Sequence, residues 1–220
     1  AKRTCRLLTK PMRGLPFYED PKYHKYLLSQ ARADLFPVSR ILNQLPLYDT
    51  HNVLDFGMGN GYFLDGFLRN LPDDAHVWGA ECQELLIDYC LQRKVKEKIE
   101  RFTPFYIERT EHPLLPDWIP PMDLIFCSCV MSTFADPTLA LRGIGRVLRE
   151  KKPVVVIDWE RKEAPSGPEL IQKVSRDRME YFIDEAGYNI SQRLKINEFV
   201  YGMVLFKDPE KFEETVYYQM

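Results

Sequence analysis

The segment 53–64, VLDFGMGNGYFL, holds the residues whose types and spacing are best suited to binding a ligand. Gly57, Gly59 and Gly61 alternate with larger residues, directly after a short apolar run that contains Asp55. Glycine lets the backbone turn sharply and lets a ligand approach it closely. A helix is predicted to follow, and its first N–H groups have no partner within the helix. The loop is therefore predicted to hold a nucleotide-like or adenosine-containing molecule.

A second acid follows the loop at an informative distance. Glu81 ends the apolar segment HVWGAE, 20 residues after Gly61. An acid near this spacing accepts hydrogen bonds from ribose hydroxyls in dinucleotide-binding folds. Asp55, at the edge of the preceding strand, can reach a cationic amino group directly or through water. Tyr62 stands where the fingerprint G-x-G-x-x-G needs its third glycine, which argues against a nicotinamide dinucleotide.

The elements that must position these residues alternate between strand and helix. Strands are predicted at 52–56, 76–81, 101–107, 122–130 and 153–159, and helices at 23–45 with a break near Pro37, 62–70, 84–98, 136–149 and 168–186. Two strands, 189–199 and 200–206, then follow each other directly, and the tail 211–219 is predicted to add a short edge strand. Such alternation predicts an α/β fold, a three-layer doubly wound sheet that is mostly parallel, with one of the last strands antiparallel.

Composition and charge indicate one globular domain. The chain has 220 residues, of which 45% are hydrophobic and 28% charged, and its net charge of −2 gives no overall field that attracts nucleic acid or an anionic membrane. The basic segment 1–13 is an exception, and we interpret it as a solvated end, with a contact arm as the alternative. No apolar run approaches the roughly 20 residues of a membrane span.

The five cysteines lack the spacing of a disulfide framework, which fits a reducing cytosol and a cytoplasmic protein. Cys127 and Cys129 form a C-x-C pair within an apolar run. We interpret them as buried apolar side chains, with a metal or soft-element site as the alternative. No cysteine–histidine cluster is present in the sequence, so no metal site is expected.

The ordered motifs resemble a known family. VLDFGMGNGYF, VWGAE, PMDLIFCSCVMSTFADPTLALRGIGRVLRE and PVVVIDWE together are similar to the class I S-adenosylmethionine-dependent methyltransferases, of the small-molecule type. The resemblance extends from about residue 52 to residue 206, and EAGYNISQRLKINEFVYGMVLF resembles the final antiparallel hairpin of that family. The resemblance implies a Rossmann-like sheet of seven strands, the last of them antiparallel and inserted next to strand five. It also implies S-adenosyl-L-methionine as the cofactor.

The resemblance implies roles for particular residues. Gly57, Gly59 and Gly61 would pass around the methionine part of the cofactor with Asp55 nearby, and Tyr62 would either cover that part or only pack. Glu81 would bind the ribose and Cys82 would lie beside the adenine. An acid after strand three, Glu108 or Glu111, would contact the adenine amine, and Ser128 or Cys129 would line the methyl-transfer channel. Residues 1–50 would form a helical lid, with aromatic residues such as Tyr18, Tyr23 and Tyr26, over a cofactor-binding domain of residues 51–220.

The chain departs from the family in two places. EKKP, at 150–153, stands where a glycine pair is common, and CSCVMS replaces the N/D-P-P-Y type motif of enzymes that methylate amino groups of nucleic acids. Catalytic residues therefore stay unassigned. Asp158 and Glu160, which flank Trp159, are candidates for a substrate role, with capping or surface positions as the alternative, and His112 is interpreted as an exposed loop residue.

These features favour a methyltransferase acting on a small-molecule acceptor, with no membrane or nucleic-acid partner. They leave the oligomeric state undetermined. A protein or RNA methyltransferase is an alternative, and it gains support if segment 1–13 shares one positive surface with Arg93, Lys94, Lys96 and Lys98. A cofactor-binding or assembly protein without turnover is another alternative. An NAD-dependent oxidoreductase is disfavoured by the displaced third glycine and the terminal hairpin.

Overall fold

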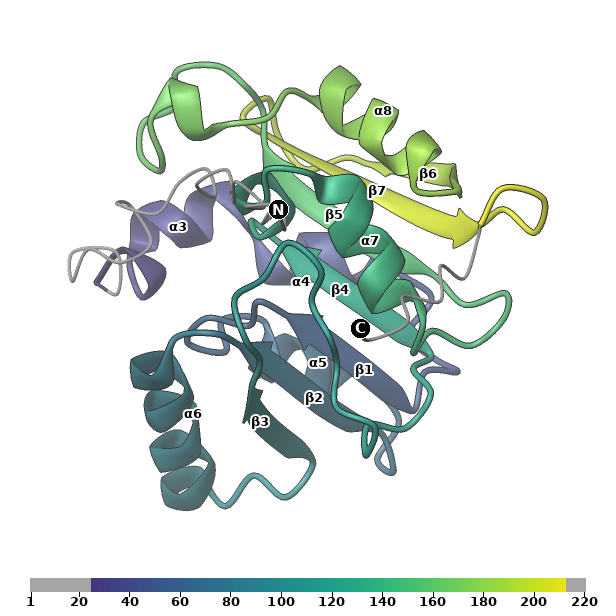
Figure 1. Cartoon of the computed structure of the whole chain (residues 1–220). Helices are drawn as coiled ribbons and strands as arrows, with labels where there is room; N and C mark the ends of the chain where they lie inside the picture. Colours follow the sequence, from purple (N-terminus) through teal and green to yellow (C-terminus); the bar gives the residue numbers. More distant parts are fainter. Residues whose placement is uncertain (1–24, 213–220) are drawn as a thin grey trace, which may run out of the picture.

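A seven-stranded sheet runs through the computed structural model, which describes residues 25–212 (Figure 1). The strands lie in the order β3-β2-β1-β4-β5-β7-β6. Their bounds are β1 Asn52–Phe56, β2 His76–Glu81, β3 Phe102–Tyr106, β4 Leu124–Ser128, β5 Val154–Trp159, β6 Tyr188–Leu194 and β7 Val200–Lys207. The basic segment 1–13 and residues 213–219 of the predicted edge strand 211–219, together with Tyr18 and Tyr23, lie outside the described residues.

The sheet is parallel except for one strand. β1 pairs in parallel with β2 and β4, and β7 runs antiparallel to both β5 and β6. Every residue of β4 and β5 is buried, as expected for parallel strands covered on both faces. The structure therefore confirms the doubly wound, mostly parallel sheet and its antiparallel hairpin.

Helices cover both faces of the sheet (Figure 1). Their bounds are α3 Gln30–Leu35, α4 Val38–Leu42, α5 Leu64–Asn70, α6 Glu84–Glu97, α7 Pro137–Gly145 and α8 Arg176–Glu185, with short 3-10 turns at Met131–Thr133 and Leu170–Gln172. One apolar core contains side chains from α3 to α6, and the other contains side chains from α7 and α8. The chain therefore has three layers. None of the helices within 25–212 combines the length and the apolar character that crossing a bilayer would require.

Local capping explains where several helices begin and end. Asp136 accepts a hydrogen bond from the Thr138 N–H, with Pro137 in the first turn, so the predicted start of α7 is confirmed. The predicted break in the first helix is also confirmed, because α3 ends before Pro37 and α4 begins after it.

The predicted helix at 168–186 is wrong in its first part. α8 begins only at Arg176, where Ser175 accepts from the Arg178 N–H. Residues 160–175, which we call the β5–α8 loop, are held by tertiary contacts instead. The Lys173 ammonium donates to the Lys162 carbonyl at 2.8 Å and lies over the Trp159 ring. These contacts override the helical preference of the segment.

Candidate functional site

The glycine loop between β1 and α5 has a backbone conformation that glycine favours. Gly57, Gly59 and Gly61 have φ angles of 75°, 58° and 71°. A Cβ on Gly57 would lie 2.7 Å from a methyl carbon of Val130, so a side chain is excluded there. A Cβ on Gly59 would meet only a methyl carbon of Leu27, at 3.5 Å, so this glycine borders open space. The glycine loop is therefore both a turn and a surface that a ligand can approach closely.

The Glu81 carboxylate joins the glycine loop to the start of α6. Its Oε2 accepts from the Gly59 N–H at 3.0 Å, and its Oε1 accepts from the N–H groups of Cys82 and Gln83 at 2.8 and 3.1 Å. The side chain is largely buried. A carboxylate has about four acceptor positions, and the three N–H groups leave one for another donor, such as a hydroxyl.

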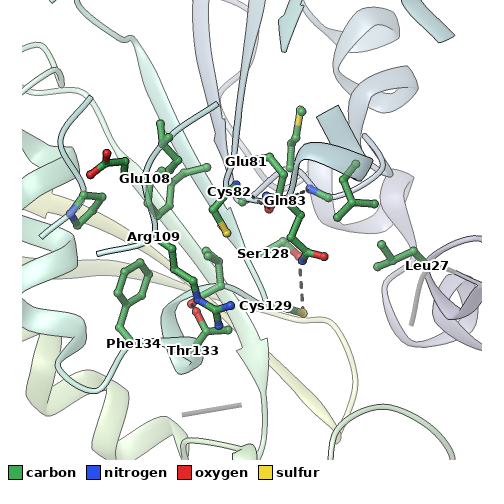
Figure 2. Close-up of a pocket in the computed structure, with 18 of the residues that line it drawn as sticks. Leu27, Glu81, Cys82, Gln83, Glu108, Arg109, Ser128, Cys129, Thr133 and Phe134 are labelled. Carbon is green, nitrogen blue, oxygen red and sulfur yellow. Dashed lines mark hydrogen bonds between the residues drawn. The ribbon is translucent and has the colours of Figure 1, made fainter. Parts of the chain in front are cut away.

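A pocket opens beside this carboxylate, with about 800 Å³ of space including its mouth. Figure 2 shows Glu81, Cys82 and Gln83 at its centre, with Leu27 on one side and Glu108, Arg109 and Phe134 on the other. The lining residues are Leu27, Arg32, Phe56, Gly57, Met58, Gly59, Glu81, Cys82, Gln83, Leu86, Ile107, Glu108, Arg109, Thr110, Pro113, Ser128, Cys129, Val130, Thr133 and Phe134. The pocket lies at the carboxyl ends of β1, β2 and β4, where ligands bind in doubly wound sheets.

The candidate residues named from the sequence fall into two groups. Seven of them line the pocket: Gly57, Gly59, Glu81, Cys82, Glu108, Ser128 and Cys129. Four others, Asp55, Gly61, Tyr62 and Glu111, do not line it. The Tyr62 hydroxyl donates to the Phe36 carbonyl at 2.9 Å and so ties the glycine loop to the segment between α3 and α4.

The two acids after β3 have different surroundings. Glu108 lines the pocket. The Oε2 of Glu111 accepts from the N–H groups of Ala135 and Asp136, at 3.0 and 3.2 Å. Glu111 therefore orders the turn before α7, and Glu108 is the acid available to a ligand.

Arg32, which the sequence patterns did not single out, reaches the pocket from α3. Its side chain is buried, and its guanidinium lies 4.6 Å from the centre of the Tyr62 ring. Burial raises the pKa of Asp55 to about 7, although the Arg32 charge acts in the opposite direction and the Glu81 charge adds to the rise. The charges of Arg32 and Glu81 therefore both act on Asp55, in opposite directions. The sequence signal that could have identified Arg32 was its position four residues before Phe36, because this spacing places both side chains on one helix face.

Asp158, in β5, lies behind the pocket wall and does not line the pocket. It is fully buried and accepts from the Ser132 N–H and hydroxyl, at 3.0 and 2.9 Å, and from the Trp159 N–H at 2.8 Å. Burial raises its pKa to about 6, against the effect of these hydrogen bonds. Glu160 forms an ion pair with Arg176 at 3.3 Å. Both acids are therefore engaged in holding the fold.

Thiols near the pocket are neutral. Burial raises the pKa of Cys82 and of Cys129 to about 12, and neighbouring carboxylates add to each rise. Cys127 is fully buried among apolar side chains. Within residues 25–212, no group of three or more histidine, cysteine or acidic side chains is arranged to hold a metal ion.

Comparison with known proteins places the chain among methyltransferases. A family model described as "Methyltransferase domain" matches residues 48–207, more than half of the chain. A search of curated proteins found no match.

Several solved structures share the fold. A SAM dependent methyltransferase from Aquifex aeolicus is 22% identical with a TM-score of 0.76, over 84% of this chain and 97% of that one. An O-methyltransferase from neocarzinostatin biosynthesis, in complex with S-adenosyl-L-homocysteine and 1,4-dihydroxy-2-naphthoic acid, is 14% identical with a TM-score of 0.63, over 90% of this chain and 65% of that one. The [4+2]-cyclase SpnF is 14% identical with a TM-score of 0.66, over 81% of this chain and 83% of that one.

The likeness to these structures establishes the fold, and this chain spans less than two thirds of the O-methyltransferase. The glycine loop, the carboxylate at the end of β2 and the strand order agree with the family match. The chain belongs to the methyltransferase domain family.

Proposed function

We propose that the chain binds S-adenosyl-L-methionine in the pocket beside Glu81 and transfers its methyl group to a small-molecule acceptor. The observation that carries the proposal is the Glu81 carboxylate, which bridges the glycine loop and α6 and keeps acceptor capacity toward the pocket. An adenosine ribose offers the two hydroxyls that such a carboxylate binds.

The lining residues fit the parts of this cofactor. Gly59, whose missing side chain leaves open space, would border the methionine part. Arg32, which also lines the pocket, would supply a cation suited to the cofactor's carboxylate. Cys82 and Glu108 would flank the adenine, and Ser128 would line the methyl-transfer channel. Asp55 would contribute through the charge balance below the loop, and Gly61 and Tyr62 through the shape of the loop.

Methyl transfer requires little from the protein beyond positioning the cofactor and the acceptor. The bound cofactor supplies a methyl group on an electrophilic sulfonium. Cys129, which lines the pocket, is neutral near pH 7, and Asp158, which is buried behind the pocket wall, accepts hydrogen bonds from Ser132 and Trp159. The chain therefore contributes by orienting the two reactants and excluding water, which can supply up to about 7–11 kcal/mol.

The N-terminal segment would cover the site. Leu27 and Arg32 line the pocket from the residues before β1, which supports a lid of residues 1–50 over a cofactor-binding domain of residues 51–220. A concave, mostly apolar pocket suits a small acceptor. The free thiols of Cys82, Cys90, Cys127 and Cys129 support the cytoplasm as the proposed compartment.

A cofactor-binding protein without methyl transfer is the second candidate, since a [4+2]-cyclase shares this fold. To separate the two, the protein is incubated with methyl-labelled S-adenosyl-L-methionine and a metabolite extract. We expect label in the small-molecule fraction, lost in Glu81→Gln and kept in the exposed control Glu100→Gln. Label only in the protein or RNA fraction would replace the proposed acceptor class. Cofactor binding with no labelled product in any fraction would favour the second candidate.

A further inference from the structure

A second pocket lies where α4, α8 and the β6–β7 hairpin meet, and it shares no lining residue with the first. Figure 1 shows α8 above the hairpin. We call this hollow the basic pocket, and it is lined by Arg40, Arg176, Arg193, Leu194, Lys195, Ile196, Asn197, Val200, Tyr201 and Gly202. Four of these residues carry a positive charge, and none is acidic.

Two of the four cations are held in place by acids at the margin of the pocket. The Nε and Nη2 atoms of Arg193 each donate to one oxygen of Glu180, both at 2.9 Å. Arg176 pairs with Glu160 at 3.3 Å. These ion pairs fix the orientation of both guanidinium groups and leave each with further N–H donors, because a guanidinium has five.

The other two cations have no carboxylate partner among residues 25–212. Arg40 donates from Nε to the Lys195 carbonyl at 3.1 Å, which orients its guanidinium without neutralising it. The Lys195 ammonium forms no ion pair with a described residue. Four cations against two carboxylates leave two positive charges at one concave site, on a chain whose net charge is −2.

Four apolar or aromatic residues also line the basic pocket: Leu194, Ile196, Val200 and Tyr201. Their side chains are largely buried, those of Leu194, Ile196 and Val200 in one core and that of Tyr201 in the other, and the Tyr201 hydroxyl donates to the Val174 carbonyl at 3.2 Å. Charged and apolar residues thus line the same pocket. This lining suits a ligand that combines an oxyanion with an apolar body.

We propose that the basic pocket binds the phosphoryl group of a phosphorylated small molecule, whose apolar part contacts the apolar lining residues of the hairpin. Guanidinium forks match the oxygens of a phosphoryl group, and the three arginines come from three different elements, α4, α8 and β6. In this proposal, one tetrahedral anion accepts hydrogen bonds from more than one of these arginines. The pocket is separate from the cofactor site, so its occupancy does not depend on methyl transfer.

The test compares the wild-type chain with Arg40→Gln/Lys195→Gln, which removes the two cations that have no carboxylate partner. Titration calorimetry uses inorganic phosphate and phenyl phosphate as probes, with sodium chloride of matched ionic strength as the blank. We expect saturable binding of phenyl phosphate, tighter than that of inorganic phosphate, and about tenfold or more weaker in the double variant. Arg69→Gln/Lys96→Gln, which removes two exposed cations elsewhere, should bind like the wild type.

Three results would overturn the proposal: no saturable binding, an equal response to sodium chloride, or unchanged affinity in the double variant. Equal affinity for the two probes would assign the site to free phosphate and overturn the phosphorylated small molecule. Circular dichroism and the affinity for S-adenosyl-L-homocysteine confirm that the double variant is folded, and both should be unchanged because the two pockets share no residue.

Discussion

Replacing Asp55 by asparagine should stabilise the protein, and by an amount that depends on pH. Asp55 is buried below the glycine loop, where desolvation raises its pKa to about 7 from the usual 3.8, with Arg32 opposing and Glu81 adding to the rise. The folded chain therefore keeps the Asp55 proton to a higher pH than the unfolded chain. Because the unfolded state binds fewer protons between these two pKa values, Asp55 makes the folded state less stable as pH rises through this window.

The magnitude follows from the two pKa values. The difference between about 7 and 3.8 corresponds to about 4 kcal/mol at about 1.4 kcal/mol per pKa unit. This cost is nearly absent below about pH 3, where the carboxyl is protonated in both states, and is complete above about pH 7. Asparagine has a similar shape and no charge, so it avoids the cost at every pH.

The assay is urea unfolding of the wild type and Asp55→Asn at a series of pH values, with the exposed Asp73→Asn as the matched control. The free energy of unfolding of Asp55→Asn should exceed that of the wild type by about 4 kcal/mol near pH 8, with the difference falling toward zero near pH 3. The difference for Asp73→Asn should stay near zero. A pH-independent difference, or a wild type that is the more stable protein at pH 8, would refute this description of Asp55.

Gly57→Ala should lower the free energy of unfolding by about 1–3 kcal/mol in urea titrations, because φ is 75° and the new Cβ would lie 2.7 Å from a methyl carbon of Val130; unchanged stability would contradict this geometry. Glu111→Gln should cost about 1–3 kcal/mol of stability through its weakened bonds to Ala135 and Asp136, and calorimetry should show unaltered cofactor affinity. Glu108→Gln should leave the stability unchanged and weaken cofactor binding. Weaker cofactor binding by Glu111→Gln than by Glu108→Gln would disprove the assignment of Glu108 to the pocket.

The sheet and most of its elements could be predicted because local sequence signals agree with the fold. The bounds of β1 and β2 match the predicted segments 52–56 and 76–81, and Asp136 caps α7 as its sequence context indicated. Continuous apolar runs such as VVVI indicate strands buried on both faces, and β5 is one. Such elements can be predicted from the sequence because their local preferences agree with their tertiary context.

Long-range contacts were beyond the reach of local patterns. The β5–α8 loop replaces a predicted helical turn because Lys173 is held by Lys162 and Trp159, which no periodicity reveals. The same limit applies to Arg32, whose burial depends on how α3 packs against the glycine loop. The choice between Glu108 and Glu111 likewise depends on the turn before α7, 24 residues from Glu111.

The most direct test of the cofactor site is calorimetric titration of S-adenosyl-L-homocysteine into the wild type, Glu81→Gln and the control Glu100→Gln. Glu81 accepts from the Gly59 N–H, lines the pocket and is proposed to accept from a ribose hydroxyl, so the wild type and the control, which both keep it, should bind with equal affinity. Glu81→Gln should bind at least about tenfold more weakly, from the loss of charge-assisted hydrogen bonds. Equal affinity in all three proteins, or no binding by the folded wild type, would contradict the assignment of this pocket.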